Sequence, residues 1–379
     1  MFVIIILMNF LINSSNSKGG GGIQVTDSIC GMLNHYPQHK FVVVLSSYFN
    51  KTKERLQGYD NVTLVVHNVK NDFKTLAFGR DKTLDALTTE YNIDAVLTIF
   101  VPSRWQPRPP HLCGFARSHL VLSDSPFMKR IGWKEKLLYK LMTIYFRRCS
   151  KEFYTENPYI TEKFQRLMGQ NRKVHTVTNY YNQVYDQPEL WGHNYTLPPF
   201  QGTTLLTVSS WNTHKNFPIM VDICRHLENE HPDFNFRFVL TIPETRATFI
   251  PDEYRSHFVL LGPVDVSECP YLYQQADIML LPSLLECFSA TYPEAMRMEV
   301  PIITTDLEFA KGLCGDAACY YSAVDGKAAA EAIYHVATDK AYAQQLVESG
   351  KIQLKQYDNY EQRTAKLIDL LEKIAKGES

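Results

Sequence analysis

Two glutamates in one short stretch are the side chains of this sequence best suited to chemistry. Glu286 and Glu294 lie eight positions apart in LPSLLECFSATYPEAMRMEV. The apolar run Ile278–Leu281 precedes them, good helix formers extend from Tyr292 to Met298, and a second apolar run follows at 302–303. This order predicts a strand, a loop, a helix and a strand. Ligands of open α/β sheets bind beyond the carboxyl ends of the strands, where both glutamates would lie, although a solvated surface helix would explain either acid alone.

A lysine follows the first strand predicted in the second half of the chain. Lys215 and Asn216 occur in SSWNTHKNFPIM, after the apolar run Thr203–Val208 and at the expected start of a helix. The N-terminus of a helix favours an anion through its dipole and its free N–H groups. A lysine there adds a full positive charge, which suits a diphosphate. A merely exposed lysine is the alternative interpretation.

A run of glycines, Gly19 to Gly22, separates the apolar start of the chain from a helical pattern. Such a turn between a strand and a helix lets backbone N–H groups approach an anion, although a flexible loop would look the same. The start itself, MFVIIILMNFLI, is predicted to be a buried strand rather than a signal peptide, because it lacks a basic region and a small-residue exit. Neither half carries G-x-G-x-x-G after its first strand, which disfavours a dehydrogenase.

Apolar strands and amphipathic helices alternate through both halves of the chain, which predicts an α/β fold with doubly wound sheets. The strands are expected at 41–45, 62–66, 95–101, 174–177, 203–208, 236–240, 258–261, 278–281 and 302–304. The helices include 81–91, 133–148, 219–228, 271–275 and 359–376. A chain of 379 residues is too long for one ordinary core. We therefore expect domains at 1–185 and 200–358, joined by a polar linker, and a final helix at 359–379 that packs back towards the first domain.

Composition excludes several classes of protein. The net charge of -1 gives no excess of cations to neutralise nucleic acid. The eight cysteines form no CxxC pair and no set with the spacing of a zinc site, so no metal is predicted. Scattered thiols in a chain of this length indicate a reducing compartment, so we expect a cytoplasmic protein.

One segment suggests contact with a membrane. From Trp133 to Arg148 the sequence reads WKEKLLYKLMTIYFRR, in which apolar residues recur at helical spacing and most of the other residues are basic. A basic amphipathic helix can lie on an anionic membrane surface, and it can also be an ordinary packed helix with a solvated face. Both interpretations remain open.

Residues 200–350 resemble the retaining family 4 glycosyltransferases of the GT-B fold. The resemblance rests on the lysine, on the E-x7-E pair within LLPSLLECFSATYPEAMRMEVPIITTD, on VLLGPVDVSECPYLYQQADIMLLPS before it and on GDAACYYSAVD after it. The first 180 residues agree in outline only, through the glycine loop. The resemblance implies two Rossmann-like domains facing each other across a cleft, the first for a variable acceptor and the second for a UDP- or GDP-sugar donor.

The same resemblance implies catalytic roles and a mechanism. Glu286 would contact the hydroxyls of the donor sugar, Lys215 would neutralise the departing diphosphate, and His119 is the nearest candidate on the acceptor side, where a structural histidine is the alternative. Retention is expected without a covalent nucleophile, because the acceptor attacks on the face that the diphosphate leaves. Such a path needs positioning and charge stabilisation, and neither a metal nor a further cofactor is expected.

The remaining implied contacts bind the donor. Glu294 would accept hydrogen bonds from the ribose hydroxyls, for which a carboxylate is chemically suited. The other donor-binding candidates are Lys215, Asn216, Phe288, Ser289, Ser210, Gly20, Gly21 and Gly22. The resemblance further implies a glycan or lipid-linked acceptor, polysaccharide or glycoconjugate biosynthesis, and a place at the inner face of the membrane.

The sequence departs from the family pattern in three places. Ser209-Ser210 stands where the family has Gly-Arg, so one expected cation is missing. Cys287 and Ser289 replace two glycines, and the aspartate motif of the first domain has no clear counterpart. A degenerate member that binds a nucleotide sugar or a partner without turnover, and a GT-B epimerase, are therefore alternatives.

Overall fold

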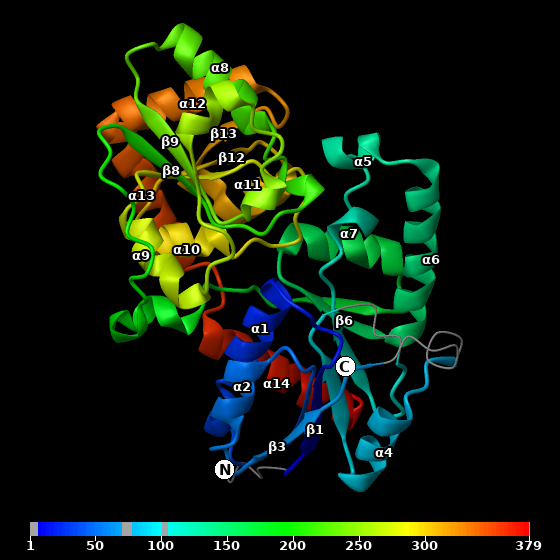
Figure 1. Ribbon diagram of the computed structural model, residues 1–379. Helices are drawn as coiled ribbons and strands as arrows, with labels where there is room; N and C mark the ends of the chain where they lie inside the picture. The colour runs from blue at the N-terminus through cyan, green and yellow to red at the C-terminus, as the bar shows by residue number, and fades with distance from the viewer. Residues whose placement is uncertain (1–6, 70–77, 101–104, 379) are drawn as a thin grey trace. The chain divides into compact units, whose positions relative to one another are not determined.

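The computed structural model describes residues 7–69, 78–100 and 105–378. The chain forms two compact units (Figure 1). The first unit comprises Met1–Val121, Ile131–Asn179 and Asp358–Ser379, and the second comprises Leu122–Arg130 and Tyr180–Tyr357. Residues 1–6 of the predicted first strand and residues 101–104, where the strand predicted at 95–101 meets a proline-rich loop, lie outside the described residues.

The first unit is built on a parallel sheet of seven strands in the order β3-β2-β1-β4-β5-β6-β7. The strands are β1 (Asn9–Ser14), β2 (Lys40–Leu45), β3 (Val62–Val66), β4 (Ala95–Thr98), β5 (His111–Gly114), β6 (Glu152–Thr155) and β7 (Lys173–Thr176). The helices are α1 (Gly21–Cys30), α2 (Asn50–Leu56), α4 (Lys82–Glu90), α6 (Trp133–Cys149), α7 (Pro158–Met168) and α14 (Tyr360–Lys376). The central strands are almost fully buried, as expected for a sheet covered on both faces.

The last helix of the chain, α14, completes the core of the first unit. Its buried face joins the apolar cluster formed by the sheet and α1. Arg363 of this helix is 2% exposed, and its guanidinium donates to the side chain of Asn179 and, over 2.6 Å, to Ser28 Oγ. Two hydrogen bonds between Thr178 and Asp358 also hold the segment just before α14 in the first unit. A helix that follows the second unit in sequence thus belongs to the first unit in space.

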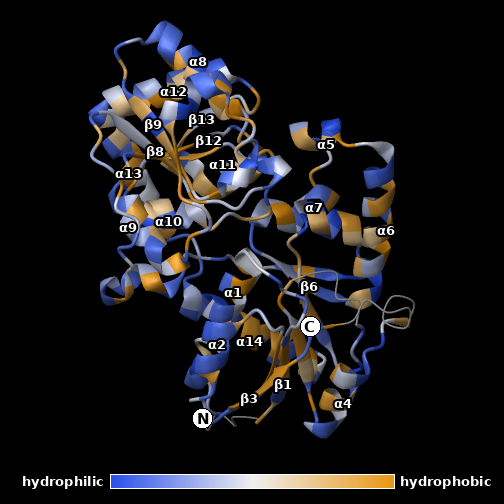
Figure 2. Cartoon of the chain, viewed as in Figure 1, coloured by the Kyte–Doolittle hydropathy of each residue, from blue (hydrophilic) through white to orange (hydrophobic). Residues whose placement is uncertain are grey.

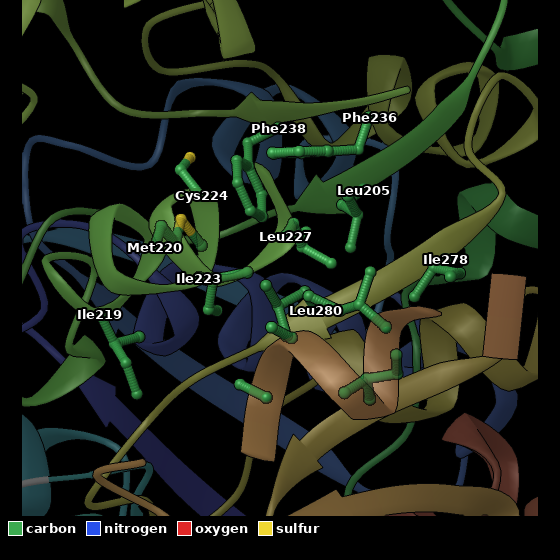
Figure 3. Close-up of a cluster of buried hydrophobic side chains, with 14 of the residues drawn as sticks. Leu205, Ile219, Met220, Ile223, Cys224, Leu227, Phe236, Phe238, Ile278 and Leu280 are labelled. Atoms are coloured by element: carbon green, nitrogen blue, oxygen red, sulfur yellow. The ribbon is translucent and has the colours of Figure 1, made fainter. Parts of the chain in front are cut away.

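The second unit contains a parallel sheet of six strands in the order β10-β9-β8-β11-β12-β13. The strands are β8 (Thr203–Thr207), β9 (Phe236–Leu240), β10 (Phe258–Leu260), β11 (Ile278–Leu281), β12 (Ile302–Thr305) and β13 (Ala318–Tyr321). The helices are α5 (Pro126–Arg130), α8 (Ile219–Glu230), α9 (Cys269–Gln274), α10 (Thr291–Arg297), α11 (Glu308–Cys314), α12 (Gly326–Thr338) and α13 (Lys340–Leu354). Figure 3 shows α8 packing its apolar face against β8, β9 and β11, with Ile223 and Leu227 among the buried side chains.

Both units are doubly wound α/β folds, as the alternation of apolar runs predicts. The strands β5 (HLCG), β6 (EFYT) and β13 (ACYY) were not predicted, because none of them contains a run of aliphatic residues. In each sheet the strand order reverses at one place, between β1 and β4 in the first and between β8 and β11 in the second. Ligands of such folds bind where the order reverses, at the carboxyl ends of the strands.

Candidate active site

The candidate site of the second unit lies where β8 and β11 pair side by side. The side chain of Thr207, at the end of β8, donates to the carbonyl of Leu280 over 2.7 Å. Further out, the N–H of Leu284 donates to the carbonyl of His214 over 2.8 Å. The loops that follow the two strands are therefore held together at the point where the strand order reverses.

The sequence predicts that Lys215 lies at the start of a helix, and the structure shows that it does not. It ends a short 3-10 turn, Thr213–Lys215, and α8 begins four residues later at Ile219. The break arises because Asn216 adopts a left-handed conformation with φ 53°, and Pro218 then precedes the first turn of α8. A tight turn therefore positions the side chain of Lys215, and this residue is not part of the first turn of α8.

Lys215 and Glu286 form an ion pair, with 2.5 Å between Nζ and Oε1. The two side chains are only 13% and 10% exposed. Because water is largely excluded, attraction between the charges is stronger here than at a surface, and losing either partner would leave a costly buried charge. Burial lowers the pKa of the neighbouring His214, so Lys215 supplies the positive charge at this point. The pair offers a cation for an anionic ligand and a carboxylate that can accept hydrogen bonds from hydroxyl groups.

Glu294 lies on α10, is 4% exposed and faces two tyrosines. Burial raises the pKa of its carboxyl to about 7, and the nearby hydroxyls of Tyr185 and Tyr273 oppose that rise. The hydroxyl of Tyr273 donates to Glu294 Oε2 over 3.3 Å, whereas that of Tyr185 is close without a well-aligned bond. A buried carboxyl that titrates near neutrality can gain much from a ligand that donates hydrogen bonds to it.

The sequence did not identify either tyrosine as part of the site. Tyr273 belongs to α9, whose predicted helix gave no sign of a polar role, and Tyr185 lies in a segment interpreted as a linker. Both are fully buried, with ring centroids 6.2 Å apart. Only the tertiary structure brings these two segments to Glu294.

The other donor-binding residues predicted in the second unit lie in the loops that follow β8 and β11. The N–H of Ser209 donates to Thr241 Oγ1 over 2.9 Å, which ties the loop after β8 to the end of β9, and Ser210 beside it is exposed. Ser289 is buried and bonds to Thr291 at the start of α10, over 2.7 Å. The ring of Phe288 packs edge-on against Tyr357, with centroids 6.0 Å apart.

The predicted residues of the first unit lie on two of its loops. Gly20 precedes α1 with φ 61°, a conformation that favours glycine, and a Cβ added at Gly20 or Gly21 would meet open space. The loop that holds Gly20, Gly21 and Gly22 follows β1, at the place where the strand order reverses. His119 lies after β5 and packs its ring against that of Tyr139, with centroids 4.3 Å apart.

In residues 7–69, 78–100 and 105–378 no group of three or more His, Cys, Asp or Glu side chains is arranged to hold a metal ion. Over the same ranges, none of the helices has the length and apolar character needed to cross a bilayer.

The structure resembles several proteins of known structure. Sucrose-phosphate synthase from Thermosynechococcus elongatus matches with a TM-score of 0.72 and 13% identity over 98% of this chain and 100% of that chain. A glycosyltransferase from Rickettsia africae has a TM-score of 0.70 and 16% identity, over 97% of this chain and 99% of that chain. HepE of Anabaena, in complex with UDP and glucose, has a TM-score of 0.69 and 14% identity, over 96% of this chain and 99% of that chain. At such low identities these likenesses show the fold, which is GT-B.

A second comparison concerns the sequence alone. The profile of the family described as Glycosyl transferases group 1 matches residues 202–339, the stretch that holds Lys215, Glu286 and Glu294. A search of curated protein sequences found no match. The family match and the fold together support a glycosyltransferase.

Proposed function

We propose that this protein is a retaining glycosyltransferase that moves a sugar from a UDP- or GDP-sugar to a glycan or lipid-linked acceptor. The observation that carries the proposal is the buried Lys215–Glu286 pair, at the point where the strand order reverses and inside the segment that matches the family. Such a transferase would serve polysaccharide or glycoconjugate biosynthesis. The eight cysteines are buried and scattered along the chain, which suits a reducing compartment such as the cytoplasm.

The geometry suggests how a donor would be held. A diphosphate competes with Glu286 for Lys215, because both are anions that can approach the same ammonium. Donor binding would therefore release the Glu286 carboxylate to accept hydrogen bonds from the hydroxyls of the sugar. The ribose hydroxyls would donate to Glu294, whose carboxyl is buried and has only one well-aligned tyrosine bond.

In the proposed reaction the bond between the anomeric carbon and the diphosphate oxygen breaks, and the diphosphate leaves with the electron pair. The acceptor oxygen forms a new bond to the same face of that carbon. Its proton passes to the departing phosphate oxygen, which keeps the charges balanced. Lys215 stabilises the negative charge as it develops, and the enzyme contributes mainly positioning and electrostatics.

Two neighbours suggest which nucleotide to test first. HepE of Anabaena holds UDP and glucose, and the α,α-trehalose-phosphate synthase from Burkholderia vietnamiensis is described as UDP-forming. The latter has a TM-score of 0.67 and 10% identity over 98% of this chain and 99% of that chain. UDP is therefore the first candidate, with GDP as the second.

An epimerase is the second candidate function, because a putative UDP-N-acetylglucosamine 2-epimerase from Listeria monocytogenes has the same fold, at a TM-score of 0.60 and 10% identity over 98% of both chains. The two activities differ in their products. A transferase releases a nucleoside diphosphate and leaves the sugar on an acceptor, whereas an epimerase returns an isomeric sugar.

A thermal-shift screen against UDP, GDP, ADP and CMP tests the donor site. A nucleotide at 100 times its dissociation constant should stabilise the protein by roughly 2.7 kcal/mol, which gives a clear rise in Tm. We expect the largest shift with UDP and its loss in Glu294→Ala, while Glu299→Ala, at an exposed position five residues further on, should keep it. If no nucleotide shifts the Tm of the native protein, the donor site is refuted.

Removal of divalent cations with EDTA tests whether the proposed transfer reaction needs a metal ion. Lys215 is proposed to do the work that a divalent cation does in other sugar transferases, so release of nucleoside diphosphate should be unchanged within twofold after treatment with EDTA. Loss of turnover with EDTA, restored by Mg²⁺ or Mn²⁺, would contradict this part of the proposal.

A further inference from the structure

Helix α6 of the first unit leaves large apolar side chains in solvent. Trp133 is 71% exposed, and Leu137, Leu141 and Ile144 are 51%, 48% and 51% exposed. These four residues are three or four positions apart, so they share one face of the helix. Leu138, 53% exposed, lies at the margin of this face. A continuous apolar stripe of this kind on a single helix differs from scattered surface leucines and indicates an interaction surface.

The second half of α6 packs into the first unit through the face opposite the stripe, whereas residues 133–138 are exposed on every side. The ring of Phe146 is fully buried among Phe115, Phe153 and Phe164, at centroid distances of 5.2, 6.3 and 5.6 Å. Near the middle of the helix, Tyr139 packs against His119. The helix is therefore held by one face, and the apolar stripe points away from the body of its own unit.

Basic residues border the stripe. Helix α6 carries five cations and one acid. With about 3.6 residues per turn, Lys136, Lys140 and Arg147 fall along one edge of the stripe and Lys134 along the other, while Glu135 falls on the opposite side of the helix. Figure 2 shows this mixture of hydrophobic and hydrophilic residues along α6.

We propose that α6 docks the protein on an anionic lipid membrane, lying in the plane of the interface with Trp133, Leu137, Leu141 and Ile144 in the acyl region. The apolar stripe would enter the bilayer while the bordering lysines reach the headgroups, which is the arrangement of interfacial helices. This inference goes beyond the proposed sugar transfer and does not depend on it.

The charge pattern favours a membrane over other partners. A second copy of the chain would place two strongly basic helices against each other, which is electrostatically unfavourable. A nucleic acid would pair with the lysines and leave the apolar stripe uncovered. An anionic bilayer satisfies both the stripe and its charged borders at once.

Flotation with lipid vesicles tests the proposal. The full chain should float with vesicles of phosphatidylcholine and phosphatidylglycerol, and bind vesicles of phosphatidylcholine alone at least tenfold more weakly. Lys136→Gln/Lys140→Gln should weaken binding roughly 25-fold, because each lysine near an anionic surface contributes about a factor of five. Leu137→Gln/Leu141→Gln should weaken it at least tenfold, because each leucine adds insertion energy.

Matched variants on the second unit serve as controls. Lys340→Gln/Lys355→Gln removes two exposed lysines, and Val324→Gln/Ile352→Gln removes two apolar residues that are 51% and 64% exposed. Both should float like the native protein. The fluorescence of Trp133 gives a second readout, since its emission should shift to the blue on binding, and Trp133→Phe should abolish the shift.

Several results would overturn the proposal. It fails if the native protein does not float, if neutral and anionic vesicles bind equally, or if the α6 variants bind as well as the controls. It also fails if the native protein is a dimer that Leu137→Gln/Leu141→Gln dissociates, or if it binds single-stranded DNA more tightly than anionic vesicles. The nucleotide-induced Tm shift, measured on the same α6 variants, reports the donor site separately, so the two proposals can fail independently.

Discussion

Replacement of Lys215 by methionine should lower kcat/KM about 10²- to 10³-fold, the usual effect of losing one group that stabilises charge in the transition state. The variant should also weaken binding of the nucleoside diphosphate, because its cation is gone. Methionine matches the length of the lysine stem, so the change removes the charge with little change in packing. Product release measured over a range of donor concentrations separates the two effects.

The ion pair requires a control for folding. Lys215→Met leaves the Glu286 carboxylate buried without its partner, which should cost about 3 kcal/mol of stability. Lys215→Met/Glu286→Gln removes both charges and should regain most of that stability, but not the activity. Lys311→Met breaks the exposed pair with Glu308 and should cost less than about 1 kcal/mol. If the double variant recovered activity with stability, the pair would be structural and the proposed role of Lys215 would be wrong.

Sequence reasoning located the candidate site because its residues follow strands. Lys215 and Glu286 are 71 positions apart, yet each comes just after an apolar run, and the carboxyl ends of parallel strands meet at one edge of the sheet. The doubly wound α/β class could be predicted for the same reason, since alternating apolar strands and helices leave few arrangements, whereas GT-B was implied by the resemblance of residues 200–350. The local conformation of Lys215 could not, because it depends on the left-handed Asn216.

Residues whose surroundings depend on tertiary packing could not be identified from the sequence. Tyr185 and Tyr273 approach Glu294 from segments that carry no polar pattern of their own. Arg363 is buried in the first unit although it belongs to the last helix of the chain. The structure adds to the sequence at α6, where Trp133 and Leu137 are exposed, and this exposure supports the proposed membrane docking.

Glu294→Gln should stabilise the unliganded protein at high pH while weakening UDP binding. The folded pKa of Glu294 is about 7, above its ordinary value of 4.5, because burial disfavours the charged form. Its contribution to stability is therefore full below pH 4.5 and is lost as the pH rises through 7, a difference of about 3 kcal/mol. Glutamine stays neutral and avoids that loss. Chemical denaturation at pH 5 and pH 8 should show the variant gaining stability over the native protein only at the higher pH.

The same carboxyl should make UDP binding depend on pH. Ribose hydroxyls donate to the ionised form, so affinity should fall as the pH drops below 7, and Glu294→Gln should weaken binding at pH 8 roughly 10- to 100-fold. In the variant, the affinity for UDP should depend on pH below 7 only through the titration of the nucleotide itself. Glu156 is a matched control, since burial raises its pKa to about 8 and it lies in the first unit. Glu156→Gln should change stability with pH but leave UDP affinity unchanged in titration calorimetry. If instead Glu294→Gln binds UDP as tightly as the native protein at pH 8, Glu294 does not hold the ribose.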